Sequence, residues 1–389
     1  MNILFISSAR TWGGGEVWLE QICVALNGRG HNVVVACRPQ SKLFDRLTAS
    51  SIRAFPLNIS GDFNPFTIAK LHHIVKKFGV NIICTGTDKE LRLGGIAAMV
   101  AGVPVVVSRE VDFPIKNTAV NRFYYTRVAA GMIVNSHATY NTMLVSAPWL
   151  KEQDIEIIWK GIPIDEYESG SAADIREENN LDPQDCIAGF LGRLDEQKGI
   201  PTLLDAMKVA VQSQPRLKLV LAGVGNLSDT IDAFRRDNHL EKHIFMSGFR
   251  SDVGAFLRGI DFLVMPSYWE GFGYSAVEAM ASGKAVIGTY SSSLPEIIEN
   301  GRTGFLVPPR SADDLSEAMV RLANDHELCK LMGRAGFSRA NRLFQQNRMI
   351  IKTELFFEKI VKAHFKPHPG VAYIPISEHP ELPLRVLNK

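Results

Sequence analysis

The sequence predicts an α/β protein of two doubly wound domains, each a parallel sheet covered by helices on both faces. Short apolar runs rich in β-branched residues alternate with longer helical patterns through both halves of the chain. Continuous apolar strands between helices are typical of a buried parallel sheet. The alternation stops once, in a polar stretch at residues 166–185, and the length of 389 residues favours two cores over one.

The first half contains six expected strands. These are Ile3–Ile6, Val33–Cys37, Arg53–Leu57, Asn81–Cys84, Val103–Val107 and Met132–Val134. Helical patterns lie between most of them, for example at Glu16–Asn27, Pro65–Phe78 and Lys89–Ala101. We therefore expect a Rossmann-like N-terminal domain over residues 1–165.

The second half repeats this scheme with five expected strands. These are Ile187–Leu191, Leu217–Leu221, Ile244–Met246, Phe262–Met265 and Ala285–Ile287. The helical patterns between them include Pro201–Gln214, Asn226–His239 and Phe272–Ala281. We expect a linker at 166–185 and a Rossmann-like C-terminal domain at 186–348. A crossing C-terminal helix, Met349–His364, and a Pro-rich tail fill 349–389.

Composition excludes several classes of protein. A hydrophobic fraction of 46% is too high for a disordered chain, and a net charge of +2 argues against nucleic acid as a partner. The five cysteines form no Cys-x-x-Cys pair, as in the reduced core of a cytoplasmic protein. We expect no leader before Ile3–Ile6, and the longest weakly polar stretch, Gly94–Ser108, is too short to span a bilayer.

Ligands of doubly wound folds bind at the carboxyl ends of the strands, so the loops that follow strands hold the candidate site residues. Gly13, Gly14 and Gly15 follow the first strand and open a helix at Glu16. Their N–H groups and the helix N-terminus suit an anion, and the alternative is a plain tight turn. A dinucleotide fingerprint fits badly, because Gly-x-Gly-x-x-Gly counted from Gly13 ends at Trp18.

Two more loops suit phosphates. Arg193 and Lys198 bracket the loop after Ile187–Leu191. An Arg fork and a Lys point charge can neutralise a diphosphate, although both could be solvated surface charges. The loop at 222–226 offers backbone amides, or is a mere turn.

The most informative loop follows Phe262–Met265 and contains Glu270, with Glu278 eight residues further on. Eight residues are about two helical turns, so we expect both carboxylates to face one crevice. A carboxylate in an otherwise small and apolar helix is costly unless it is paired. Sugar hydroxyls are suitable donors, and a structural ion pair is the alternative.

This combination of motifs resembles the retaining family-four (group 1) glycosyltransferases of the GT-B fold. The C-terminal half carries Gly192-Arg193-x4-Lys198-Gly199, the Glu270-x7-Glu278 spacing, Glu278-Ala279-Met280-Ala281-Ser282-Gly283, Leu294-Pro295-Glu296 and Gly304-Phe305-Leu306-Val307. The N-terminal half matches mainly at the glycine loop and at Trp159-Lys160-Gly161-Ile162-Pro163. The GT-B fold implies two domains facing a central cleft, with the acceptor bound by the N-terminal domain and the nucleotide sugar by the C-terminal domain.

The resemblance implies a role for each matching residue. Arg193 and Lys198 are expected to hold the donor diphosphate and to stabilise its charge as it leaves. Glu270 is expected to hold the hydroxyls of the donor sugar, and these three residues are the expected catalytic set. The other expected donor-binding residues are Gly14 and Gly15 at the phosphates, Phe249 and Arg250 beside the base, Gly271, Phe272 and Gly273 at the sugar, and Glu278 at the ribose.

Three departures from the family pattern are visible. Many members have a His at the end of the fifth strand, where this chain has Arg109 followed by Glu110. We expect Arg109 to face an anionic acceptor or the phosphates, and we place Glu16, Arg109 and Glu110 on the acceptor side. Asn-Gly-x-Asp is replaced by residues 160–163, and the glycine pair before Leu-Pro-Glu by the serines at 291–293.

The implied activity is that of a hexosyltransferase-type enzyme that retains anomeric configuration. It moves a sugar from a nucleotide-diphosphate sugar to a hydroxyl of a glycan, lipid-linked or small-molecule acceptor, as in cell-envelope glycan biosynthesis. We expect no cofactor and no metal, because the chain has no Asp-x-Asp pair and its two cations can neutralise the diphosphate. In front-face attack the leaving phosphate oxygen accepts the acceptor's proton, so no strong protein base is required.

Basic and aromatic residues alternate in one N-terminal segment. They are Phe113, Lys116, Arg122, Phe123, Tyr124, Tyr125 and Arg127. The segment is either an amphipathic helix with one face in the core or a peripheral membrane contact. We expect the protein to be cytoplasmic, and the second interpretation would place it at the inner face of the membrane. Two rival functions also stay open: a nucleotide-sugar epimerase or hydrolase on the same fold, and a non-catalytic nucleotide-sugar-binding protein.

Overall fold

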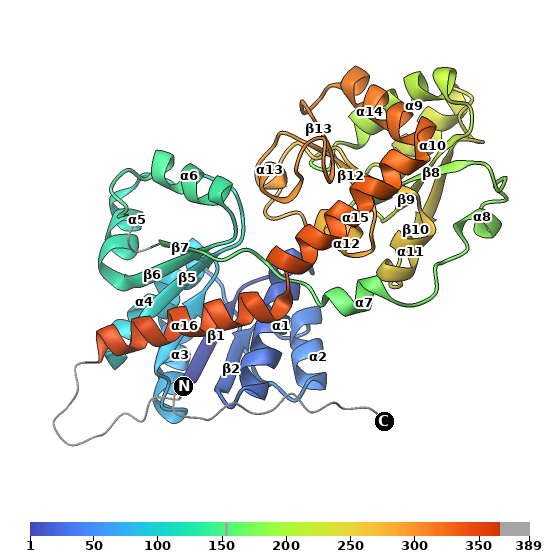
Figure 1. Cartoon of the computed structure of the whole chain (residues 1–389). Helices are drawn as coiled ribbons and strands as arrows, with labels where there is room; N and C mark the ends of the chain where they lie inside the picture. The colour runs from blue at the N-terminus through green and yellow to red at the C-terminus, as the bar shows by residue number, and fades with distance from the viewer. Residues whose placement is uncertain (152–154, 366–389) are drawn as a thin grey trace, which may run out of the picture.

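The computed structural model describes residues 1–151 and 155–365 and contains two parallel sheets flanked by helices (Figure 1). The N-terminal sheet has the strand order β3-β2-β1-β4-β5-β6-β7, and the C-terminal sheet has the order β10-β9-β8-β11-β12-β13. In each sheet the chain starts near the middle, builds toward one edge and then returns to build toward the other. This is double winding, and it confirms the predicted fold class.

The N-terminal sheet consists of β1 (Asn2–Ser7), β2 (Asn32–Cys37), β3 (Arg53–Pro56), β4 (Ile82–Thr85), β5 (Val105–Arg109), β6 (Ala129–Val134) and β7 (Ile155–Ile157). Its helices are α1 (Gly14–Gly28), α2 (Lys42–Ala49), α3 (Pro65–Lys77), α4 (Asp88–Ala101), α5 (Ala119–Phe123) and α6 (His137–Ser146), and a π-helical turn follows α5 at Tyr124–Val128. All six expected strands are present. The sequence missed β7, a three-residue strand at the edge of the sheet.

The C-terminal sheet consists of β8 (Cys186–Leu191), β9 (Leu217–Ala222), β10 (Ile244–Gly248), β11 (Phe262–Met265), β12 (Ala285–Thr289) and β13 (Gly304–Val307). The helices around it are α9 (Ile200–Ser213), α10 (Ser228–Asp237), α11 (Val253–Gly259), α12 (Tyr274–Ala281), α13 (Leu294–Ile297), α14 (Ala312–Asn324) and α15 (His326–Leu343). Two short helices, α7 (Ile164–Glu168) and α8 (Ile175–Glu178), lie before this sheet in the chain.

The last described helix, α16 (Gln346–His364), returns to the N-terminal sheet (Figure 1). Phe357 and Ile360, on the apolar face of α16, are buried in one cluster with Phe5 and Trp18 of the N-terminal domain. Glu354 of α16 also accepts hydrogen bonds from Arg29 and pairs with His31 of the same domain. The N-terminal domain is therefore built from two segments that are distant in sequence.

All five cysteines are buried and free. None of the described helices is both long and apolar enough to cross a membrane.

Candidate active site

The loops after β8 and β11 bring Lys198 and Glu270 together. Lys198 Nζ lies 2.5 Å from Glu270 Oε1, and the Ser267 hydroxyl donates to the same oxygen at 2.8 Å. Gly199 makes this approach possible: it has a φ of +71°, and a Cβ there would lie 2.0 Å from the carbonyl oxygen of Pro266. Two predicted site residues thus form one partly buried, hydrogen-bonded pair at the carboxyl end of the sheet.

Arg193 lies in the same loop as Lys198 but is open to solvent. Its side chain is 65% exposed, and its guanidinium pairs with Asp195 at 2.6 Å and donates to Gln197 at 2.6 Å. Gln197 in turn donates to the backbone carbonyl of Trp269, next to Glu270. Arg193 is therefore held near the Lys198–Glu270 pair with a guanidinium that an anion can reach.

Glu278 finds a partner that the sequence did not indicate. The hydroxyl of Tyr167, in α7, donates to Glu278 Oε1 at 3.0 Å. Burial raises the pKa of Glu278 from 4.5 to about 7, and the Tyr167 hydrogen bond opposes this rise. The carboxylate therefore changes protonation near neutral pH. Its expected contact with a ribose stays a prediction.

The start of α12 touches the N-terminal domain through glycines. A Cβ on Gly271 would lie 2.6 Å from the backbone oxygen of Glu110, so this contact between domains requires glycine. A Cβ on Gly14 would lie 3.2 Å from the ring of Tyr274. The predicted phosphate loop of one domain therefore faces the predicted sugar loop of the other.

The remaining residues of this loop serve mainly as structure. Phe272 is buried, with its ring edge-on to Phe344 and Tyr274, and its backbone carbonyl accepts from Ser293. Gly273 precedes α12 with a φ of +99°, which explains why the helix begins two residues later than expected.

On the N-terminal side, Gly15 and Glu16 lie in the first turn of α1, close to Glu110. A Cβ on Gly15 would contact the Glu110 side chain at 3.9 Å. Burial raises the pKa of Glu16, and the nearby Glu90 and Glu110 add to the rise. These residues line the domain contact, and their expected role toward an acceptor stays a prediction.

Arg109 makes its polar contacts within its own domain. Its side chain is 8% exposed, donates to the Phe113 carbonyl and the Tyr125 hydroxyl, and lies 3.6 Å from Asp88. As the last residue of β5 it points toward the π-helical turn of its own domain. These contacts occupy the guanidinium within its own domain, and the expected contact of Arg109 with an anionic acceptor or the phosphates stays a prediction.

The two residues predicted beside the base differ in availability. Phe249 is 70% exposed, and Lys42 Nζ of the N-terminal domain lies 5.8 Å from its ring centroid. Arg250 is paired with both Asp252 and Glu178, and the hydrogen bond that it donates to Asp252 raises the pKa of Arg250. Phe249 is thus the one of the two that is free to stack on a base.

Two further functional candidates, Tyr274 and Lys160, are given no role by the sequence motifs. The hydroxyl of Tyr274 is buried and has no hydrogen-bond partner among the described residues. Burial raises the pKa of Tyr274, and the nearby Glu110, Glu278 and Tyr167 add to this rise. Lys160 is fully buried against Glu110. An orphaned hydroxyl and a buried cation are both costly, so each indicates a role beyond packing.

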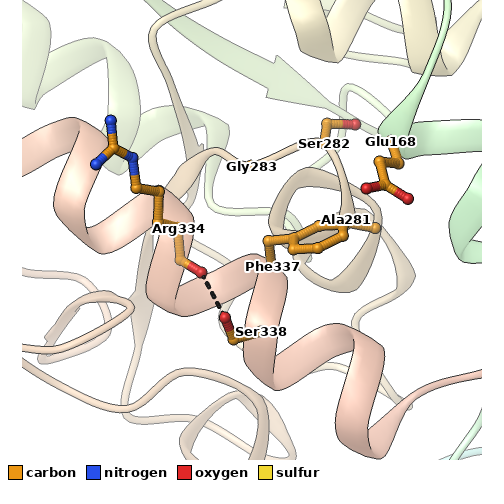
Figure 2. A pocket seen from close by; sticks show the side chains of 7 residues that line it. All are labelled: Glu168, Ala281, Ser282, Gly283, Arg334, Phe337 and Ser338. Atoms are coloured by element: carbon orange, nitrogen blue, oxygen red, sulfur yellow. Dashed lines mark hydrogen bonds between the residues drawn. The ribbon is translucent and has the colours of Figure 1, made fainter.

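A separate cavity of about 320 Å³ lies at the other end of α12 (Figure 2). It is lined by Glu168, Ala281, Ser282, Gly283, Arg334, Phe337 and Ser338. Because Gly273 marks the opposite end of this helix, the cavity is not part of the candidate active site.

Comparison with known families decides what this arrangement is. Residues 171–339 match the family described as Glycosyl transferases group 1, and residues 12–166 match Glycosyltransferase Family 4. The chain belongs to the group 1 glycosyltransferases. The two matches together cover both domains of this glycosyltransferase.

Two bacterial relatives of this glycosyltransferase are similar over most of their length. The UDP-Gal:alpha-D-GlcNAc-diphosphoundecaprenol alpha-1,3-galactosyltransferase of Escherichia coli is 25% identical over 76% of this chain and 81% of its own. The capsular polysaccharide biosynthesis glycosyltransferase CapM of Staphylococcus aureus is 24% identical over 75% of this chain and 79% of its own.

Among solved structures, HepE of Anabaena in complex with UDP superposes with a TM-score of 0.83 and 22% identity, over 92% of this chain and 100% of its own. A glycosyltransferase from Rickettsia africae superposes with a TM-score of 0.84 and 21% identity, over 93% of this chain and 98% of its own. These likenesses confirm the GT-B fold predicted from the sequence.

Proposed function

We propose that this glycosyltransferase transfers a hexose from a UDP-sugar to a hydroxyl of a lipid-linked or glycan acceptor, with retention of configuration and without a metal. The observation that carries the proposal is the convergence of Arg193, Lys198 and Glu270 at the carboxyl ends of β8 and β11. The UDP-bound HepE structure and the UDP-Gal specificity in the name of the Escherichia coli relative support the choice of donor.

The chemistry follows from the charges. The bond between the sugar's anomeric carbon and the β-phosphate oxygen breaks, and charge develops on the leaving diphosphate. The Arg193 fork and the Lys198 ammonium stabilise that charge. The acceptor oxygen forms its bond to the anomeric carbon on the same face, and its proton passes to the leaving phosphate oxygen. With two cations at the diphosphate, Mg²⁺ is not needed to neutralise it.

Glu270 serves the sugar rather than the phosphate. Its Oε1 accepts hydrogen bonds from Lys198 and Ser267, and the remaining lone pairs of the carboxylate can accept hydrogen bonds from sugar hydroxyls. Charge-assisted hydrogen bonds of this kind orient a substrate strongly. Lys198 therefore links the groups that hold the sugar and the leaving diphosphate.

The test is a panel of UDP-, GDP- and ADP-sugars, with binding measured by calorimetry and products identified by mass spectrometry and proton NMR. We expect UDP-hexoses to bind, UDP to be released in EDTA, and the product to keep the α-configuration. Glu270→Gln should lower the rate at least tenfold, and Glu241→Gln, at an exposed carboxylate, should not. A metal requirement or an inverted product would contradict the proposal.

The same panel separates the rival functions. An epimerase would convert the UDP-sugar to its isomer without an acceptor, and a non-catalytic binding protein would release no UDP. Epimerised donor, or tight binding with no UDP release under any condition, would favour those rivals.

We also propose a peripheral membrane contact through an aromatic patch on the N-terminal domain. Phe66 is 80% exposed, Phe63 51%, Phe123 48% and Val120 44%. The ring of Tyr124 lies 6.3 Å from that of Phe63 and 5.5 Å from that of Phe123, which places these rings in one patch. Tyr124 and Tyr125 themselves are buried, so part of the segment belongs to the core, as in the alternative interpretation.

Basic residues beside the patch favour an anionic surface. Lys116, Arg122 and Arg127 are exposed in the same segment. Flotation with phosphatidylglycerol vesicles should recover the protein, and phosphatidylcholine vesicles should not. Combining Phe66→Ser with Phe123→Ser should abolish recovery, whereas Val145→Ser, at an 84% exposed position on α6, should leave it unchanged. Full solubility with both vesicle types would contradict this contact.

A further inference from the structure

The side chain of Lys160 is enclosed on all sides. It is 2% exposed, and its Nζ lies 2.7 Å from Oε1 and 2.6 Å from Oε2 of Glu110. The same ammonium lies 3.8 Å from the ring centroid of Trp18. Burial lowers the pKa of Lys160, and the facing Glu110 carboxylate opposes this effect. Lys160 therefore contacts one carboxylate and one aromatic face.

Stability alone does not explain such a pair. Removing two charges from water costs about as much as their attraction returns, and buried ion pairs can often be replaced by apolar residues without loss. A pair of this kind can instead fix the orientation of a group. The orientation of Glu110 is what Lys160 controls.

Glu110 is fixed at both ends. Asn135 donates to its backbone carbonyl at 2.9 Å, and Ser108 donates to its carboxylate at 2.6 Å. The residue lies between Gly15, in the predicted phosphate loop, and Gly271, in the predicted sugar loop of the other domain. Its carboxylate is thus held beside the contact between the two domains.

The hydrogen bonds of the carboxylate leave room for one more donor. A carboxylate has about four acceptor positions. Lys160 occupies two, one on each oxygen, and Ser108 occupies a third. The Glu110 side chain is 17% exposed, so the remaining position is accessible to a small polar group.

We propose that Lys160 is a positioning residue that fixes the Glu110 carboxylate, and that Glu110 binds the attacking hydroxyl of the acceptor. This inference rests on the proposed glycosyl transfer. Glu110 orients the hydroxyl and takes no proton, since the proton passes to the leaving phosphate oxygen. In hydrolysis of the donor, a water molecule takes the place of the acceptor hydroxyl and is oriented in the same way.

The test uses the full chain and three variants: Glu110→Gln, Lys160→Met and the double variant. Each single change leaves one buried charge unpaired and should lower the melting temperature, while the double variant removes both charges and should recover most of it. Lys208→Met, at an exposed lysine of α9, is the control for loss of a lysine. The probes are UDP and UDP-galactose or UDP-glucose, whichever the wild type hydrolyses.

In the double variant we expect the Kd for UDP and the KM for the UDP-sugar to stay within twofold of wild type. The kcat for UDP release should remain at least tenfold lower. If kcat in the double variant recovered together with the melting temperature, the pair would be purely structural. That result would overturn this inference but not the proposed function. Failure of the wild type to bind UDP would overturn the proposed function, and this inference with it.

Discussion

Glu296, in α13 of the C-terminal domain, caps a helix of the other domain: its Oε2 lies 2.9 Å from the backbone nitrogen of His137, the first residue of α6. Its Oε1 accepts from the next backbone nitrogen, that of Ala138, at 2.8 Å, and the indole of Trp159 donates to Oε2 at 3.0 Å. A carboxylate at a helix N-terminus is favourable, so these bonds hold the two domains together.

Glu296→Gln should weaken this connection. The variant loses the charge that faces the helix N-terminus, at a cost of about 0.3–1 kcal/mol. We expect a lower melting temperature, a larger radius of gyration by X-ray scattering and a weaker UDP affinity. Glu327→Gln, at an 84% exposed side chain of α15, is the matched control. An unchanged radius and affinity would show that the capping bonds do not govern the domain arrangement.

Gly271→Ala should separate the domains by steric contact. The added Cβ would lie 2.6 Å from the Glu110 carbonyl oxygen, which is closer than side-chain carbons approach backbone oxygens. We expect kcat to fall at least tenfold while the fold is kept. Gly28→Ala is the control, because nothing lies within 4 Å of a Cβ there. Full activity of Gly271→Ala would mean that the domains need not meet at this point.

The affinity for UDP should rise with pH through about 7. Burial raises the pKa of Glu278 to about 7, and the ionised carboxylate accepts a hydrogen bond from a ribose hydroxyl more strongly than the protonated acid does. Titration calorimetry from pH 6 to 8 checks this, and Glu278→Gln should remove the dependence. Tyr167→Phe deletes the hydrogen bond that lowers this pKa, so it should move the rise to higher pH. A flat profile in the wild type would count against the ribose contact.

The same shift predicts an effect on folding. The pKa of Glu278 is higher in the folded chain than its ordinary value of 4.5, so the folded state binds more protons between pH 4.5 and about 7. The contribution of Glu278 to stability is therefore present at low pH and is lost as pH rises through this range. Thermal unfolding at pH 5 and 8 should show a smaller decrease for Glu278→Gln than for wild type. Equal decreases would argue against the shift.

Tyr274→Phe should separate binding from stability. The Tyr274 hydroxyl is buried without a partner among the described residues, so its removal should leave the melting temperature equal or higher. If the hydroxyl meets the donor, affinity for the UDP-sugar should fall by about tenfold, near 1.4 kcal/mol. Unchanged affinity would mean that the hydroxyl faces no ligand.

The sequence predicted those parts of the site that follow from sheet topology. Lys198 and Glu270 are far apart in the chain, but they follow adjacent parallel strands, so their meeting could be expected. The Glu110–Lys160 pair could not, because Lys160 follows the unpredicted strand β7 and is buried by packing on Trp18. Tyr167 lies in a region that looks like a polar linker. The contacts of Arg109 with Tyr125 and Asp88 could not be predicted either, because the motif does not reveal which way its side chain points.

The helix α16 has a consequence for the order in which this protein can fold. The N-terminal sheet buries Phe5 and Trp18 against α16, and Glu354 closes the contact with His31. On a ribosome, the first domain to emerge therefore stays incomplete until residue 364 has been made, while the second domain has its own helices at once. The N-terminal domain is therefore the last to complete its core, and residues 1–165 alone would expose an apolar face.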